Sequence, residues 1–130
     1  MLRNMDLLCG LPEDTQVYCG HEYTLANLRF LRSIALAPSS NTTASGSNSD
    51  SGSSGRGSSD MSLQDVIDTY YQRAVELRDD CAPTLPSTLA DERRYNLFVK
   101  CREPGVQRAL HCAGDPTATM KKLREMKNNF

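Results

Sequence analysis

The residues best suited to chemistry lie near the N-terminus, in residues 17–23 (sequence VYCGHEY). This pattern predicts a short buried strand and a bend at Gly20, with His21 and Tyr23 projecting from the strand's end. A neutral imidazole in such a place suits a metal ligand. The Tyr23 phenol could hydrogen-bond a molecule held near that metal, or pack with its hydroxyl satisfied locally. Glu22 is expected to point to solvent or toward the start of the following helix.

A metal site at His21 would need partners that the spacing does not reveal. A catalytic zinc ion takes about three protein ligands and keeps one position open. The other histidine of the sequence, His111, has no ligand spacing to His21, and no acidic cluster lies beside either. Spacing alone therefore favours a hydrogen-bonded structural histidine, with the metal ligand as the open alternative.

Two cations near the C-terminus form a second candidate site. On a helix, an apolar stripe runs from Met120 to Phe130, with Lys127 inside it and Arg124 at its border. Such a pair could clamp a carboxylate or a phosphate, the arginine through its planar fork. Alternatively, the long stems cover the core while the charges favour the helix C-terminus. Geometry alone slightly favours this second interpretation.

Three blocks of the chain would position these residues. Residues 1–36 predict a short helical lead-in, a strand over about 15–19, and a helix over about 24–36 with Thr24 as its N-cap. That helix carries apolar residues on two faces, which need more partners than the sequence makes visible. Residues 37–61 are almost all Ser, Gly, Thr and Asn, which predicts a disordered insertion.

Residues 62–130 predict a helical domain, so the fold class is mainly α. Ser62 with Asp65 resembles a capping box before the clearest apolar stripe of the chain. Ser87 or Thr88 would cap a short helix after a proline-rich turn, and Pro104 would interrupt the chain again. Asp115 followed by a proline is a strong signal for the start of the last helix.

Composition limits the classes of partner and compartment. The 130 residues include 15 basic and 16 acidic side chains, for a net charge of −1, so no global field favours nucleic acid or an anionic membrane. No apolar run is long enough to span a membrane. The five cysteines are odd in number and lack a two-residue spacing, which predicts reduced thiols in a cytosol-like compartment. Most of them are expected to be buried as small hydrophobic residues.

Three separated motifs together point to a known family. Residues 11–24 look like a "LP-DT-VYCGHEYT" segment, residues 83–89 look like a "PTxPSTL" turn, and residues 115–130 look like a matching terminal helix. In this order they resemble glyoxalase II, the hydroxyacylglutathione hydrolases of the metallo-β-lactamase superfamily. The resemblance covers nearly the whole chain apart from the serine-rich stretch.

The resemblance implies a fold and a set of roles. Residues 62–130 would be the glutathione-binding C-terminal helical domain, and residues 1–36 a strand–helix remnant of the αββα sandwich. His21 would ligate one of two divalent metal ions, which are zinc, iron or manganese in the complete family. Together with Tyr23, Arg124 and Lys127 it would lie on the glutathione side of the site. The family hydrolyses S-lactoylglutathione-type thioesters to glutathione and a 2-hydroxy acid, in methylglyoxal detoxification, with a cytoplasmic location expected and a mitochondrial form left open.

One departure from the family bears on activity. The sequence lacks the family's His-x-His-x-Asp-His motif, and it also lacks the family's further histidine and bridging aspartate. The chain is therefore expected to be the C-terminal portion of the enzyme, to hold no metal by itself and to be inactive alone. Its partners would be a glutathione thioester and the missing N-terminal half. The alternative is a non-catalytic helical interaction module, or a regulator that pairs with the full-length enzyme.

Overall fold

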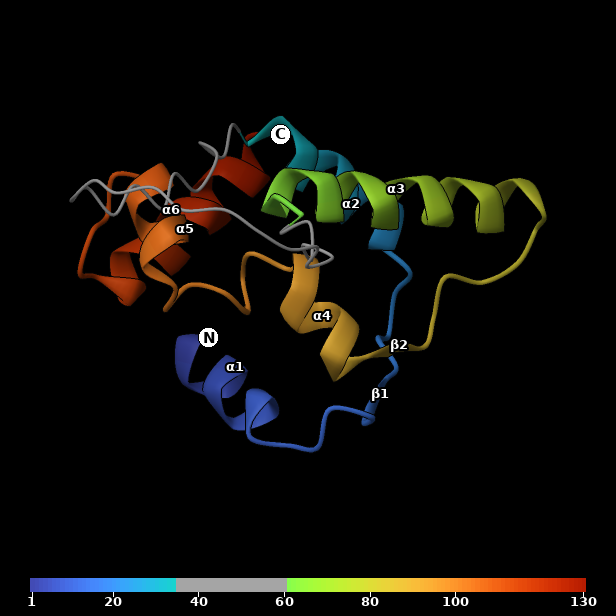
Figure 1. Ribbon diagram of the computed structural model, residues 1–130, viewed down its shortest axis with the longest axis horizontal. Helices are drawn as coiled ribbons and strands as arrows, with labels where there is room; N and C mark the ends of the chain where they lie inside the picture. The colour runs from blue at the N-terminus through green and yellow to red at the C-terminus, as the bar shows by residue number, and fades with distance from the viewer. Residues whose placement is uncertain (35–60) are drawn as a thin grey trace, which may run out of the picture.

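The computed structural model describes residues 1–34 and 61–130, and its helices dominate these two ranges (Figure 1). The elements in chain order are α1 (Leu2–Cys9), β1 (Gln16–Val17), α2 (Thr24–Ser33), α3 (Leu63–Asp79), β2 (Ser87–Thr88), α4 (Leu89–Tyr95), α5 (Pro104–Ala109) and α6 (Pro116–Asn128). The mainly α fold class is confirmed. The predicted disordered insertion lies outside the described residues, except for Met61.

Local capping starts three of the helices where the sequence predicted. The Ser62 hydroxyl accepts from the Asp65 amide, and the Asp65 carboxylate accepts from the Ser62 amide, which completes a capping box. Thr88 and Asp91 make the same reciprocal pair at the start of α4. The Asp115 carboxylate accepts two backbone N–H bonds of 2.9 Å at the start of α6. These starts need only neighbouring residues, so the sequence reveals them.

The N-terminal strand differs from the prediction in length and burial. β1 covers only Gln16–Val17 and pairs antiparallel with β2, with Gln16 opposite Thr88 and Val17 opposite Ser87. Gln16 is exposed, Val17 is half-buried and Tyr18 is 72% exposed. The expectation of a buried strand was therefore wrong, because the strand is only two residues long and neither residue is buried.

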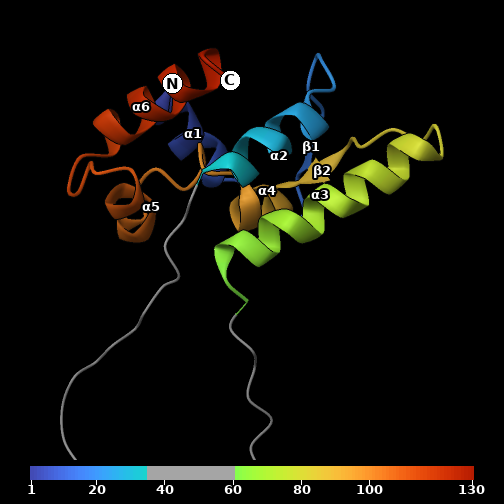
Figure 2. The same cartoon turned by 90° about the horizontal axis from the view of Figure 1, so that it is seen from above.

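Helix α2 buries two faces within the described fold. Leu28, Phe30 and Leu31 on the helix, and Ile34 at its C-cap, are each 3% exposed or less. α2 packs beside α3 and lies between α3 and α6 (Figure 2). The Phe30 ring is 6.3 Å from that of Phe98 and 5.6 Å from that of Phe130. The expectation that one face would lack partners was therefore wrong, because residues 61–130 supply them.

Two further expectations about helix ends need correction. Thr24 was expected to cap α2, but it is the first residue of that helix, and Tyr23 occupies the N-cap position without a side-chain cap bond. Pro104 was expected to interrupt the chain, but it begins the short helix α5. Proline suits a first helical position because its fixed φ is already helical and its missing N–H would have no helical acceptor there.

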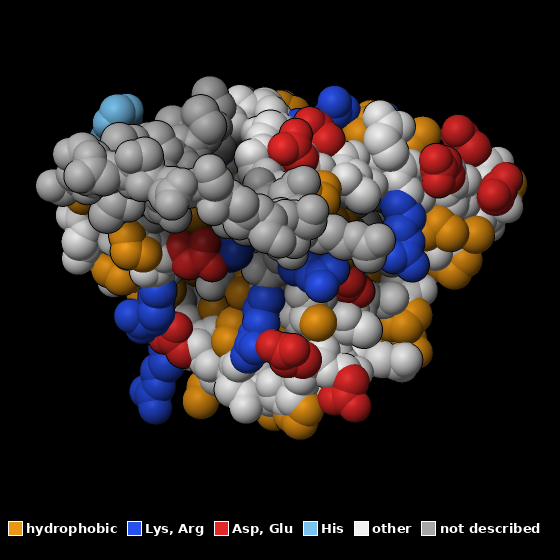
Figure 3. Space-filling view, viewed as in Figure 1, with side chains coloured by type: hydrophobic (Ala, Val, Ile, Leu, Met, Phe, Trp, Pro, Cys, Tyr) orange, Lys and Arg blue, Asp and Glu red, His pale blue; other side chains and the backbone are white. Residues whose placement is uncertain are grey.

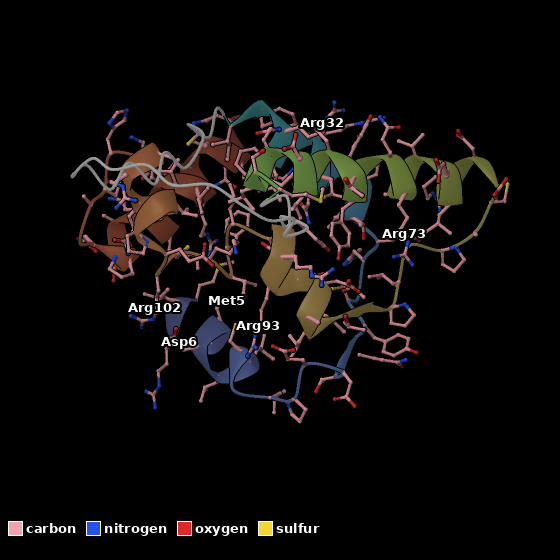
Figure 4. All side chains as sticks on the ribbon, viewed as in Figure 1. Met5, Asp6, Arg32, Arg73, Arg93 and Arg102 are labelled. Atoms are coloured by element: carbon pink, nitrogen blue, oxygen red, sulfur yellow. The ribbon has the colours of Figure 1, made fainter. Side chains whose placement is uncertain are left out.

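Helix α1 is held to the helical core by packing on α4 and α6 and by two arginines. The Arg102 guanidinium donates two bonds of 2.7 Å to the Asp6 carboxylate, while Arg93 pairs with Glu13 at 2.9 Å and also donates to the Cys9 carbonyl. Figure 4 shows Asp6 and Arg102 close together at α1, with Arg93 reaching down toward the same helix. Residues 1–34 therefore rest on the same core as residues 61–130.

The cysteines are less buried than expected. All five are free thiols, and only Cys101 is buried, while Cys9 and Cys112 are half-buried and Cys19 and Cys81 are exposed. Cys101 lies among the core residues, where burial raises the pKa of its thiol to about 11. Cys19 and Cys81 lie in connecting segments outside the core, which explains their exposure.

Replacing Phe30 should show how far the fold depends on α2. We expect Phe30→Ala to lower the free energy of unfolding by about 3–5 kcal/mol, since a fully buried ring is lost and a cavity remains. Urea unfolding followed by circular dichroism measures this change. Tyr18→Ala is the matched control, because Tyr18 is 72% exposed and should change stability by less than about 0.5 kcal/mol. Equal effects of the two variants would contradict the packing of α2.

The cysteines allow an independent test of the core. At pH 8 the Cys101 thiol, with its raised pKa, stays almost entirely protonated and is shielded from reagent. We expect iodoacetamide to modify Cys101 at least about a hundredfold more slowly than Cys19 and Cys81, because the thiolate is the reactive form. Peptide mapping by mass spectrometry measures the rates, and urea should remove the difference. Equal rates in the folded protein would refute the burial of Cys101.

Candidate functional site

His21 and Tyr23 lie in the connection between β1 and α2, and both side chains are exposed. Their rings stack with centroids 5.3 Å apart and planes only 5° from parallel. The His21 ring makes no side-chain hydrogen bond with a described residue, so the interpretation as a hydrogen-bonded structural histidine finds no support. The stacked pair instead presents an imidazole and a phenol together on the surface.

Glu22, which lies between His21 and Tyr23 in the sequence, makes contacts that the sequence did not reveal. Its Oε1 atom accepts bonds of 2.8 Å from both the backbone N–H and the hydroxyl of Thr84, and Arg78 lies 3.4 Å from its Oε2 atom. The two Thr84 bonds, then Arg78, lower the pKa of the Glu22 carboxyl. Glu22 therefore joins the segment to the turn before β2, instead of pointing to solvent or to the start of α2.

Lys127 lies against the first turn of α2. Its Nζ atom donates to the Ala26 carbonyl at 3.1 Å and lies 5.3 Å from the Phe30 ring centroid and 5.4 Å from that of Phe130. Burial lowers the pKa of the ammonium group. An ammonium group has three donors, so two remain for another acceptor. Ala26 is one helical turn beyond Tyr23, which puts Lys127 near the end of α2 that carries the tyrosine.

Arg124 lies one turn before Lys127 on α6, so the two side chains are neighbours on the helix surface. It is exposed, and its Nη1 atom lies 3.1 Å from the Met1 sulfur, at the start of α1. No contact of Arg124 with His21 or Tyr23 is found among the described residues. The structure thus connects Lys127 to the Tyr23 end of α2, whereas Arg124 approaches α1.

The donor atoms around His21 do not make a metal site by themselves. Across residues 1–34 and 61–130 there is no group of three or more His, Cys, Asp or Glu side chains that could hold a metal ion. A catalytic metal needs about three protein ligands, so at least two besides His21 would have to come from elsewhere. His21 alone therefore does not fit the metal centre of the family, although its exposed ring is accessible to one.

A cavity of about 190 Å³ lies between α2, α3, α4 and the turn before β2, and no sequence pattern indicated it. Its polar lining includes Tyr70, Arg73, Thr84 and Asp91, and the Tyr70 hydroxyl donates to Asp91 at 2.6 Å. In Figure 4, Arg73 extends from α3 toward that turn. None of the four predicted site residues lines this cavity, but Thr84, which bonds Glu22, and Thr24, which follows Tyr23, both do, so the cavity borders the His21 segment.

The surface charge and the lengths of the helices concern two classes of partner, nucleic acids and membranes. Figure 3 shows basic and acidic side chains interspersed on the part of this face that is not grey, without a continuous basic patch. None of the described helices is both long and apolar enough to cross a membrane.

Comparison with known proteins identifies the family. Residues 61–130 match the sequence model described as "Hydroxyacylglutathione hydrolase C-terminus". The whole chain is 37% identical to a hydroxyacylglutathione hydrolase from Synechococcus sp. (strain JA-3-3Ab) and covers 41% of that protein. It is also covered in full by hydroxyacylglutathione hydrolases from Nitrosomonas europaea, at 34% identity, and Cupriavidus taiwanensis, at 35%, and spans 42% and 41% of their lengths.

These matches confirm the resemblance inferred from the three motifs, and they place it in the C-terminal part of the relatives. The chain spans about two fifths of the length of the curated relatives that it matches. This chain belongs to the hydroxyacylglutathione hydrolase family.

Proposed function

We propose that this chain supplies the glutathione-binding side of a hydroxyacylglutathione hydrolase. The observation that carries the proposal is the position of Lys127, whose ammonium group is fixed on the Ala26 carbonyl one helical turn from Tyr23. A cation and a phenol near the same helix end suit a ligand with both a carboxylate and amide groups. Glutathione thioesters, the substrates named by the family's description, have this chemistry.

Each predicted residue has a distinct part in this proposal. Lys127 offers its two uncommitted N–H donors to a glutathione carboxylate, and Arg124, its neighbour on α6, supplies a planar fork for the same group. The Tyr23 hydroxyl hydrogen-bonds the peptide part of the ligand. His21, exposed beside Tyr23, would supply one imidazole ligand to the family's metal centre, and at least two further ligands would have to come from elsewhere.

The proposed clamp predicts a measurable loss of binding. We expect S-hexylglutathione, an analogue that cannot be hydrolysed, to bind weakly, and Arg124→Ala combined with Lys127→Ala to weaken it by at least about tenfold through loss of both charge-assisted contacts. Isothermal titration calorimetry measures the affinities. Lys121→Ala is the control, because this α6 lysine is 77% exposed and 3.9 Å from its only ion-pair partner in the described chain, Glu125. Unchanged binding by the double variant, or none by the unmodified chain, would contradict the proposal.

The small number of metal ligands around His21 also predicts the activity of the isolated chain. We expect no hydrolysis of S-lactoylglutathione above the uncatalysed rate, with or without added zinc, because one histidine cannot hold a catalytic metal. Release of free thiol measures the reaction, with a complete hydroxyacylglutathione hydrolase as the positive control. Robust hydrolysis that is lost on chelation would show that this proposal is wrong.

The remaining expectations about partners stay predictions. Pairing with an N-terminal half, or with the full-length enzyme as a regulator, would suit the exposed apolar side chains of Leu7, Leu11 and Tyr18, which are 67%, 45% and 72% exposed. A cytoplasmic location is likewise part of the proposal.

A further inference from the structure

We infer that Glu22 is a positioning residue, which holds the His21–Tyr23 segment against the turn at Thr84 so that the stacked His21 and Tyr23 rings keep their positions at the proposed site. This inference rests on the proposed function, because it concerns the same site. It adds a residue that does not itself touch the ligand. The contact joins residues that are 62 positions apart in the chain.

The segment that carries His21 is held at its two ends. On one side the β1–β2 ladder ends with the pair Val17 and Ser87. On the other side Glu22 bonds to Thr84. Between these two ties, residues 18–21 are all exposed, and the Tyr18 hydroxyl bonds only to nearby Gln16, at 3.2 Å. Among the described residues, Glu22 is therefore the long-range side-chain tie at the C-terminal end of this segment.

The hydrogen bonds between Glu22 and Thr84 fix the position of the Glu22 carboxylate. One carboxylate oxygen, Oε1, accepts both 2.8 Å bonds from Thr84, one from the backbone and one from the hydroxyl. Two converging donors fix the position of that oxygen more narrowly than a single bond does. Arg78, 3.4 Å from Oε2, adds charge complementarity from the end of α3.

The tie is also close to the proposed ligand groups. Glu22 immediately precedes Tyr23, the N-cap of α2, and the Tyr23 amide donates to the His21 carbonyl at 3.1 Å. A displacement of Glu22 therefore shifts both neighbouring rings. Glu22 is on the surface and outside the core cluster, so its loss should change the segment without unfolding the protein.

The test combines a local and a functional measurement on the whole chain. In Glu22→Ala, hydrogen–deuterium exchange of peptides covering residues 18–24 should become faster. The affinity for S-hexylglutathione should fall roughly tenfold, because the binding groups lose their preorganisation. Glu22→Gln keeps an acceptor oxygen and should restore most of both properties, while Thr84→Val removes only the hydroxyl donor and should have a smaller effect. The melting temperature should stay near that of the unmodified chain.

Glu13→Ala is the matched control. Glu13 also makes a long-range contact from the N-terminal segment, a 2.9 Å ion pair with Arg93, but on the other side of β1. Its loss should change neither exchange at residues 18–24 nor ligand affinity.

Unchanged exchange in Glu22→Ala would overturn the inference, as would faster exchange with unchanged affinity. If the unmodified chain binds no S-hexylglutathione, the proposed function fails. The exchange result then decides separately whether Glu22 holds the segment.

Discussion

The simultaneous burial of two faces of α2 is the constraint on which the rest of the arrangement depends. Leu28 and Leu31 are both 1% exposed on this helix, and so is Phe30, whose ring meets aromatic rings from residues 61–130. Because α2 lies between α3 and α6, its first turn comes within reach of Lys127. The segment before α2 is thereby placed as well, so packing that contains no reactive group determines where His21 and Tyr23 emerge.

The proposed site combines a rigid part with a lightly held part. Lys127 donates to a carbonyl and lies near two aromatic rings, where partial burial lowers the pKa of its ammonium group. Its cation therefore has fewer positions available than an ordinary surface lysine would have. His21 and Tyr23 are exposed and depend on contacts at the two ends of a short segment. In the proposed function, the helices would therefore supply the recognition of an anion, and an exposed connecting segment would supply the metal ligand.

Local features were predictable from the sequence, whereas features made by distant residues were not. The capping box at Ser62 and the start of α6 at Asp115 need only neighbouring residues, and both were predicted. The burial of Phe30 depends on partners in residues 61–130, and the bond from Glu22 depends on Thr84. The four candidate site residues came from the strand-end pattern, the apolar stripe of the last helix and the three motifs. No periodicity could show that Lys127 would lie on the α2 side while Arg124 approached Met1.

The register of the two-residue ladder of β1 and β2 depends on Glu22, which follows β1 in the sequence. Two paired residues by themselves specify alignment weakly, and a slip by one residue would move the strand by about 3.3 Å and turn its side chains to opposite faces. The same slip would carry Glu22 away from Thr84, and bonds of 2.8 Å could not survive it. Glu22 therefore fixes the register at a second point, and the ladder and the Glu22–Thr84 bonds together allow only one alignment of the histidine segment.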